Sequence, residues 1–416
     1  MTVEELTAQR DSAQAEYDAL AAKGLKLDLT RGKPSPRQLD LADGILGAIE
    51  RPVGADGTDL RNYGGTNGLP ELRAIFAEGL QVPADQLLAL GNSSLELMHD
   101  AIVFALLGQV PGAERRWADG EISFLCPVPG YDRHFGICER YGIKMIPVAL
   151  TADGPDMDEV ERLVAADASI KGIWCVPKYS NPTGTTYSDE TVRRLATMTT
   201  AAPDFRIFWD NAYAVHHLTD EHAELADVLA LAAEAGYADR VFVFGSSSKI
   251  TFAGAGVAFF GASPANLKWW ASHTVKRSIG PDKVNQLRHV RFLRDADGLA
   301  EHMRKLAGLI RPKFEAVDKI LTADLGDTGF ASWNAPAGGY FITLQVPDGC
   351  AADVVAKAKA AGIALTPAGA THPYGDDPSD SIIRIAPTYP ELDELETAVA
   401  GLTVCVRLSA VEKLLS

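Results

Sequence analysis

The apolar run Val241-Phe242-Val243-Phe244 leads directly into Gly245-Ser246-Ser247-Ser248-Lys249, which places a lysine behind a short serine run at the end of an expected strand. A lysine in such a position suits covalent attachment of an aldehyde if the chain holds it rigidly and keeps water away. At an unperturbed pKa near 10.4, only about one lysine in a few thousand carries a free amine at neutral pH. Burial and cationic neighbours raise that fraction. A solvated lysine at a strand end is the plainer interpretation of this segment alone, so the rest of the chain must decide.

Three further features occur in a fixed order along the chain. Asn181-Pro182-Thr183-Gly184 precedes Asp210-Asn211-Ala212-Tyr213, which precedes Lys249, and Arg384 lies near the end. An Asn-Pro-Thr-Gly segment alone is a common turn signal. The ordered set is much more specific, and it resembles the fold-type I pyridoxal-phosphate aminotransferases over nearly the whole chain. The opening from Leu27 to Pro34, which reads LDLTRGKP, further resembles the bacterial aspartate aminotransferases of subgroup Ic.

The overall composition agrees with a cytoplasmic enzyme. A chain of 416 residues, 47% apolar and 23% charged, is long enough for two domains with a large core. The net charge of -16 argues against a nucleic-acid partner. Apolar runs such as 101–107 are too short to span a membrane, and the acidic N-terminus does not match a signal peptide. The five scattered cysteines lack CxxC spacing, which predicts reduced thiols and no metal site.

The alternation of short apolar segments with helical ones predicts an α/β fold. Thr2-Val3-Glu4-Glu5 is a capping box, so we expect an amphipathic helix from there to about residue 22. Strands are expected at 122–125, 172–176, 206–209 and 240–244, each followed by a loop with one of the special residues. Such a pattern indicates a mainly parallel sheet with helices on both faces, in which ligands bind beyond the carboxyl ends of the strands. The loops with Asn181, Asp210 and Lys249 should therefore meet at one edge of the sheet.

The last third of the chain has a different pattern. A long helix is expected at 299–322, and two apolar segments at 340–344 and 382–385 are expected as strands. We therefore predict a large cofactor-binding domain over 48–300. A smaller α/β domain would combine 1–47 with 301–416.

The resemblance implies pyridoxal 5'-phosphate as the cofactor and a role for each motif residue. Lys249 would hold the cofactor covalently and then move the substrate proton as a general base and acid. Asp210 would pair with the pyridine nitrogen and keep it protonated, because a nearby carboxylate raises the pKa of its partner. Tyr213 and Asn181 would bond the phenolic oxygen, and the ring of Tyr131 would lie over the cofactor. A turn aspartate, a core tyrosine and a turn asparagine are the structural alternatives.

Phosphate binding is expected where a loop enters a helix. Gly91-Asn92-Ser93-Ser94 precedes a helical apolar pattern, and a helix N-terminus offers unpaired N–H groups to an anion. Ser246 and Ser248 would add hydroxyl groups. One departure from the family concerns an arginine that most relatives carry about eight residues after the lysine. Residues 251–260 contain no basic residue, so another group must offset the phosphate charge.

The resemblance also implies a homodimer with shared active sites. Tyr63 lies in the segment Asn62-Tyr63-Gly64-Gly65-Thr66-Asn67-Gly68, which resembles the family segment whose tyrosine reaches the cofactor phosphate of the partner subunit. A turn tyrosine in a glycine-rich loop is the structural alternative. Dimerisation is therefore part of the functional prediction.

The substrates are expected to be amino acids and 2-oxo acids. Arg384 lies in an apolar strand, where its fork suits a bidentate pair with the substrate α-carboxylate, and a structural ion pair is the alternative. Gly32 would bring backbone close to the substrate, and Asn181 would contact it as well. For the distal carboxylate of a dicarboxylic substrate, Arg31 and Lys33 compete with a second basic pair, 276–277.

That second pair is Lys276 and Arg277, and a solvated basic face is the alternative for all four residues. We predict a homodimeric aminotransferase that transfers the amino group of aspartate to 2-oxoglutarate. An aminotransferase of other specificity and a carbon–sulfur β-lyase are the alternatives. A pyridoxal-binding transcription regulator would need an added basic DNA-binding domain, which an acidic chain that starts almost at once with the fold does not suggest.

Overall fold

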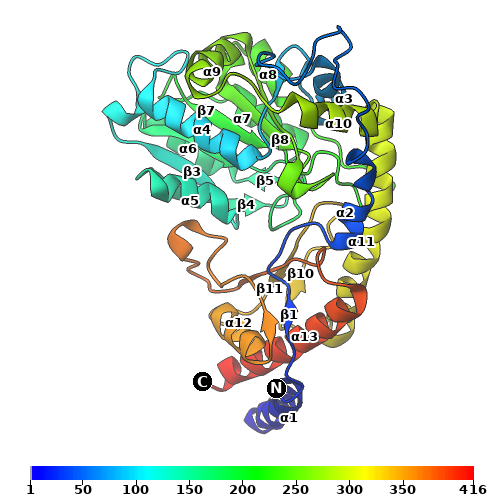
Figure 1. The fold of residues 1–416 in the computed structure, drawn as a ribbon. Coiled ribbons are helices and arrows are strands. Elements are labelled where there is room, and N and C mark those ends of the chain that lie inside the picture. Colours follow the sequence, from blue (N-terminus) through cyan, green and yellow to red (C-terminus); the bar gives the residue numbers. More distant parts are fainter. Residues whose placement is uncertain (1) are drawn as a thin grey trace.

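An eight-stranded sheet organises most of the computed structural model, which describes residues 2–416 (Figure 1). Its strand order is β2-β9-β8-β7-β6-β3-β4-β5. Strands β8, β7, β6, β3 and β4 run parallel, whereas β2, β9 and β5 pair antiparallel with their neighbours. The predicted fold class is therefore confirmed. The strands are β2 (Leu87–Ala89), β3 (Ser123–Val128), β4 (Lys144–Thr151), β5 (Gly154–Pro155), β6 (Ile170–Cys175), β7 (Arg206–Asp210), β8 (Val241–Ser246) and β9 (Ala258–Ala262).

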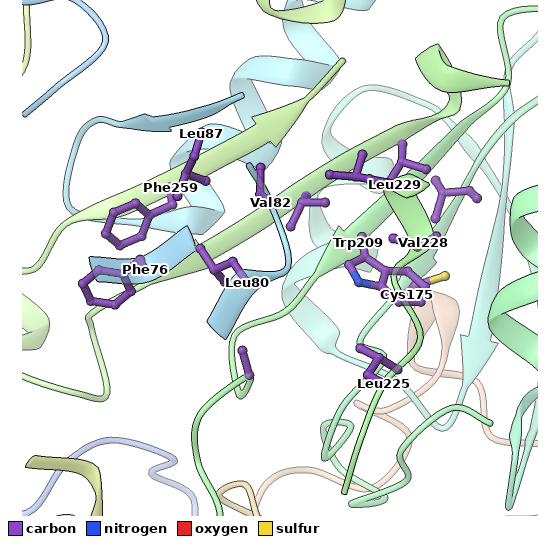
Figure 2. Packing of buried hydrophobic residues seen from close by; sticks show 14 of the residues in the cluster. Phe76, Leu80, Val82, Leu87, Cys175, Trp209, Leu225, Val228, Leu229 and Phe259 are labelled. Carbon is purple, nitrogen blue, oxygen red and sulfur yellow. The ribbon is translucent and has the colours of Figure 1, made fainter. Parts of the chain in front are cut away.

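Side chains alternate between the two faces along each buried strand, so both faces of this sheet carry apolar side chains. Helices cover both faces and bury these side chains. In β8, Val241 and Val243 belong to one hydrophobic cluster, and Phe242 and Phe244 belong to the other. Figure 2 shows part of the first cluster, where Phe76 stacks on Phe259 with ring centroids 4.3 Å apart. That cluster includes buried residues of α3 (Pro70–Leu80), α6 (Met157–Ala166), α7 (Asp189–Thr197), α8 (Val228–Glu234) and α10 (Lys283–Leu293). The opposite cluster includes buried residues of α4 (Ser94–Leu107), α5 (Asp132–Arg140) and α9 (Pro264–Arg277).

A third hydrophobic cluster gathers both ends of the chain. It contains residues of the antiparallel strands β10 (Ser332–Trp333), β11 (Ile342–Gln345) and β13 (Ile382–Ile385) and of the parallel pair β1 (Leu27–Asp28) and β12 (Ile363–Ala364). The helices α1 (Val3–Ala21), α12 (Ala351–Ala360) and α13 (Leu392–Leu415) also pack into it. In Figure 1 this part lies below the large sheet, with the N- and C-termini close together.

The helix α11 (Ala296–Leu325) runs along both parts of the molecule (Figure 1). Its Leu299 and Met303 pack into the first cluster, whereas Phe314 and Val317 pack into the third. One continuous helix thus contributes to two cores. The predicted boundaries at 47/48 and 300/301 stay a prediction, because the helix that would separate the domains belongs to both.

Several local predictions hold, with shifted ends. The side chain of Thr2 accepts from the Glu5 amide at 3.2 Å and the carboxylate of Glu5 accepts from the Thr2 amide at 2.6 Å, which confirms the capping box of α1. The long helix begins at Ala296 rather than 299, because the carboxylate of Asp295 caps it by accepting from the Gly298 amide at 2.7 Å. Strand β3 continues to residue 128, since its parallel pairing with β4 extends that far.

The structure also addresses two predictions from composition, on membrane spans and on cysteine thiols. Within residues 2–416, none of the helices combines the length and apolar character that crossing a bilayer requires. All five cysteines are buried free thiols.

Candidate active site

Three adjacent parallel strands deliver the motif residues to one edge of the sheet. Strand β6 leads to Asn181, β7 ends at Asp210, and β8 leads to Lys249. The amine of Lys249 lies 5.0 Å from the ring centroid of Tyr213 and 5.7 Å from that of Tyr340. The structure therefore brings together four of the predicted residues and adds Tyr340 to them. The four are Asn181, Asp210, Tyr213 and Lys249.

The surroundings of Lys249 favour its neutral amine. Burial lowers the pKa of Lys249, the carboxylate of Asp210 opposes that shift, and the guanidinium of Arg384 supports it. The backbone of the lysine is fixed as well. The hydroxyl of Tyr340 donates to the carbonyl of Lys249 at 3.3 Å, and the amide of Gln38 donates to that hydroxyl at 2.8 Å. A neutral amine on a fixed backbone is what attack on an aldehyde requires.

Asp210 has one occupied and one free carboxylate oxygen. Its Oδ2 lies 3.0 Å from Nε2 of His134, and this histidine ring stacks on Trp174 at 4.4 Å with an interplanar angle of 11°. Its Oδ1 is buried and has no hydrogen-bond partner within residues 2–416. A buried carboxylate oxygen without a donor is costly, so this atom fits a ligand that brings an N–H group, such as a protonated pyridine ring.

Two tyrosines stand beside this carboxylate. Tyr131 meets the ring of His134 edge-on at 4.9 Å. Burial is the main cause that raises the pKa of Tyr131 and Tyr213, and the charge of Asp210 raises both further. Both hydroxyls thus stay protonated and able to donate. His134 was missed at the sequence level, although it follows Tyr131 by one helical turn and so faces the same way.

The start of α4 and the serine run lie side by side. Ser93 occupies the N-cap position with an extended backbone, and its side chain makes no capping hydrogen bond, while Ser94 is the first helical residue. The hydroxyl of Ser248 donates to the Asn92 carbonyl at 3.2 Å. Ser246 faces Ala258 in the pairing of β8 with β9. First-turn N–H groups with nearby hydroxyls make a site that suits a phosphate group.

Arg384 reaches this edge from β13, with only 9% of its surface exposed. Its Nη1 lies 3.2 Å from Asp132 Oδ1 and 3.4 Å from Asn181 Oδ1. Its Nη2 donates to Thr366 Oγ1 at 3.1 Å. The guanidinium carbon lies 5.0 Å from the ring centroid of Phe341. The contacts of Arg384 with Asp132, Thr366 and Phe341 were not predicted, because these residues lie far from Arg384 along the chain and no local pattern indicates such contacts.

Gly32 allows the N-terminal opening to pass over the same phenylalanine. A Cβ on Gly32 would lie 2.1 Å from Phe341 Cζ, so a larger residue would have to displace the ring beneath Arg384. Arg31 and Lys33, on either side, are exposed. Lys33 Nζ lies 4.2 Å from the ring centroid of Tyr389.

The two basic pairs that could bind the distal carboxylate, Arg31 with Lys33 and Lys276 with Arg277, differ in their ion pairing. Arg31 Nε lies 2.5 Å from Asp28 Oδ2, which leaves the rest of its fork uncommitted. Arg277, at the end of α9, forms ion pairs with Glu96 and Asp100 of α4, the latter at 2.8 Å. Lys276 is exposed. The carboxylates of α4 thus already compensate Arg277.

Tyr63 stands apart from these groups. It lies in the glycine-rich turn before α3, and 79% of its surface is exposed. Its side chain is in contact with solvent rather than with the residues around Lys249.

Comparison with known proteins places the chain in a family. A family model described as aspartate amino-transferase matches residues 1–416. The chain belongs to the aspartate aminotransferase family. An aspartate aminotransferase of Corynebacterium glutamicum is 49% identical over 405 residues, which cover 97% of this chain and 94% of that protein. The crystal structure of an aspartate transaminase from the same species superimposes with a TM-score of 0.97 at 48% identity, and the match covers 99% of this chain and 98% of the other.

A more distant solved structure shares the fold. The structure of an alpha-aminoadipate aminotransferase from Thermus thermophilus aligns over 95% of both chains with a TM-score of 0.76 at 23% identity. The predicted family, the aminotransferase activity and the pyridoxal 5'-phosphate cofactor are confirmed by family membership. Subgroup Ic stays a prediction. The free Oδ1 of Asp210 and the uncapped start of α4 fit the pyridine nitrogen and the phosphate of that cofactor.

Proposed function

We propose that this aminotransferase transfers the amino group of aspartate to 2-oxoglutarate, which yields oxaloacetate and glutamate. The observation that carries the proposal is the meeting of a buried lysine, a carboxylate with a free buried oxygen and a buried guanidinium fork at one sheet edge. The name of the Corynebacterium relative supports aspartate as the amino donor.

Each residue at the edge has a proposed role. Bound pyridoxal phosphate supplies the aldehyde and the electron-withdrawing ring. Lys249 holds that group covalently, and its released amine takes the proton from the substrate α-carbon and later returns one. Asp210 keeps the ring nitrogen protonated through its free Oδ1. Tyr213 and Asn181 donate to the phenolic oxygen, and Tyr131 lies over the ring.

His134 and the start of α4 complete the proposed cofactor site. His134 orients Asp210 through the 3.0 Å contact to Oδ2 and thereby leaves Oδ1 for the ring. Ser93 and Ser94, with the backbone N–H groups of the first turn of α4, hold the phosphate. Ser246 and Ser248 add hydroxyls from the lysine segment.

Substrate binding is proposed to divide between two basic regions. Arg384 takes the α-carboxylate in its fork, and Asn181 lies beside it. The backbone at Gly32 closes over the substrate. Arg31 and Lys33 take the distal carboxylate, since Arg277 is compensated by α4. Lys33 and Tyr389 line a cavity of about 280 Å³, whose lining does not include Lys249 or Arg384.

We also propose a homodimer in the cytoplasm. Tyr63 is 79% exposed, Val275 62% and Ile279 60%, and clustered exposed apolar side chains mark interaction surfaces. Gly280 backs onto the Tyr63 turn, because a Cβ there would lie 2.7 Å from the Gly64 carbonyl. In the dimer Tyr63 would donate to the cofactor phosphate of the second copy. Five unpaired buried cysteines suit a reducing compartment.

The test is incubation of the purified protein with single amino acids and 2-oxo acids, followed by identification of the products. We expect aspartate with 2-oxoglutarate to give oxaloacetate and glutamate with the highest kcat/KM. If alanine or phenylalanine matched aspartate, the enzyme would be an aminotransferase of broad specificity. Release of ammonia and pyruvate without consumption of an oxo acid would instead establish a β-lyase.

A further inference from the structure

Helix α10 buries four polar side chains that contact neighbouring loops, among them the turn around Tyr63 (residues 62–68) and the segment that follows Lys249. Lys283, Asn285, Gln286 and His289 are each 9% exposed or less. Gln286 accepts from a backbone amide at the end of the Tyr63 turn at 2.8 Å, and His289 lies 2.9 Å from the hydroxyl of a threonine in the lysine segment. The helix therefore serves as a support for both loops.

The contact of Lys283 with the Tyr63 turn is the most specific of these. Its ammonium donates to the carbonyl of Asn62 at 2.9 Å and to the carbonyl of Gly64 at 2.7 Å. These are the two residues on either side of Tyr63. Within residues 2–416, no carboxylate lies within ion-pair distance of this ammonium. One buried cation thus binds both residues that flank Tyr63 in the chain.

The turn also packs tightly on the lysine stem. Gly65 has a positive φ of +67°, and a Cβ there would lie 2.8 Å from Lys283 Cδ. On another side, Gly280 approaches the carbonyl of Gly64 so closely that a Cβ would lie at 2.7 Å. The backbone of the turn is therefore confined between α10 and the segment before it, while the side chain of Tyr63 extends into solvent.

The two carbonyl contacts give this lysine a role that an apolar side chain could not fill. Removing a cation from water is costly, and two carbonyl acceptors compensate that cost only in part. A methionine would fill nearly the same volume without the cost. An ammonium at this place gains its value from holding the turn in one conformation.

We propose that Lys283 is a positioning residue that fixes the Tyr63 turn for contact with the cofactor phosphate of the second subunit. This inference rests on the proposed function, in which Tyr63 reaches across a homodimer. Lys283 itself contacts neither cofactor nor substrate in this arrangement. Its loss should therefore weaken the cofactor through Tyr63 and leave the affinity for a cofactor without a phosphate unchanged.

The experiment is a double-mutant cycle on the full-length apoenzyme, titrated with pyridoxal phosphate and, as a probe without phosphate, with pyridoxal. Tyr63→Phe and Lys283→Met should each raise the dissociation constant of pyridoxal phosphate roughly tenfold or more, the loss expected for a charge-assisted hydrogen bond. The double variant should bind no more weakly than Tyr63→Phe alone. Lys283→Arg, which can donate to both carbonyls, should restore binding. Lys268→Met, at an exposed lysine of α9, is the matched control and should bind normally.

Amide hydrogen exchange over residues 58–68 gives an independent readout. Exchange should be faster in Lys283→Met and unchanged in Tyr63→Phe. Additive losses of affinity, an unchanged exchange rate, or an equal loss of pyridoxal binding would each overturn the positioning role. If Lys283→Met does not fold, Lys283→Leu, which also lacks a donor, enters the same cycle with the same expected results. Coupled losses in an enzyme that does not accept aspartate would refute the proposed substrate and support this inference.

Discussion

The reaction edge, which carries Asp210, Tyr213 and Lys249, differs in burial from the opening, the loop that carries Arg31 and Lys33. At the reaction edge, Asp210 and Tyr213 are buried to 3% exposure, and the amine of Lys249 lies among aromatic rings. At the opening, Arg31 and Lys33 are exposed and lie over the ring of Tyr389. The edge is set by three adjacent strands, whereas the opening depends on one loop. If both regions act as proposed, the fold fixes the reacting groups, whereas substrate choice depends on exposed side chains of a single loop.

The largest effect is expected from replacement of the lysine. Lys249→Ala should lower turnover by roughly 10²–10⁴-fold, the contribution of general acid–base catalysis, because no other amine occupies its place. Borohydride treatment of the wild-type protein should fix the cofactor to Lys249, as shown by peptide mapping. Because burial lowers its pKa, capture of the aldehyde should extend to lower pH than for an exposed lysine. Label on Lys178, which is also partly buried, would show that the lysine has been misassigned.

Removal of the charge at Asp210 should have the next largest effect. Asp210→Asn keeps the shape but cannot hold the ring nitrogen protonated, so several kcal/mol of barrier should return, and each 1.36 kcal/mol is tenfold in rate. Cofactor binding should largely persist. Single-turnover rates measured by absorbance would decide, and a rate within about fivefold of the wild type would refute the role. His134→Phe, which removes only the support of Oδ2, should lose less.

Arg384 links the two regions and should show an intermediate effect. Arg384→Lys keeps the charge but loses the fork, which should lower kcat/KM for every amino acid by roughly 10–100-fold, the loss of a charged hydrogen bond. Because all substrates share the α-carboxylate, the ratio of aspartate to alanine should hardly change. A variant that lost activity only toward aspartate would instead place Arg384 at the distal carboxylate.

The smallest effect is expected at the loop with Arg31 and Lys33. Lys33→Met should lower kcat/KM for aspartate by about tenfold, within the range for a charged hydrogen bond, and leave alanine nearly unaffected. Lys319→Met, at an exposed lysine of α11, is the matched control. If Lys276→Met rather than Lys33→Met changed the ratio of aspartate to alanine, the distal site would lie at the end of α9.

The extent of sequence-based prediction follows the same division. The family and the fold class were predictable because Asp210 ends a short buried strand and Asn181 and Lys249 each follow one, so spacing along the chain translates into position on the sheet. Gln38 and Lys283 were not predictable. Their roles depend on hydrogen bonds to residues 302 and 221 positions away, and no local pattern encodes such contacts.

The choice between Arg31 with Lys33 and Lys276 with Arg277 was also undecided from the sequence. From the sequence all four residues could be solvated bases. In the structure Arg277 is ion-paired with two carboxylates of α4, whereas Arg31 is ion-paired with one, that of Asp28. The start of α4 was predicted from Gly91-Asn92-Ser93-Ser94, because a loop that enters a helix leaves backbone N–H groups free. Which group compensates the absent phosphate-binding arginine stays open from the sequence.

The contact between Arg384 and Asp132 gives substrate binding the character of an exchange. The fork that should receive the α-carboxylate already holds a carboxylate at 3.2 Å, and that aspartate is 35% exposed in its side chain. If the α-carboxylate takes the Nη1 group that Asp132 now contacts, one ion pair forms as another breaks. Dissolved salt weakens both pairs together. The affinity for carboxylate ligands should therefore vary less with ionic strength than two opposite charges in an open cleft would suggest.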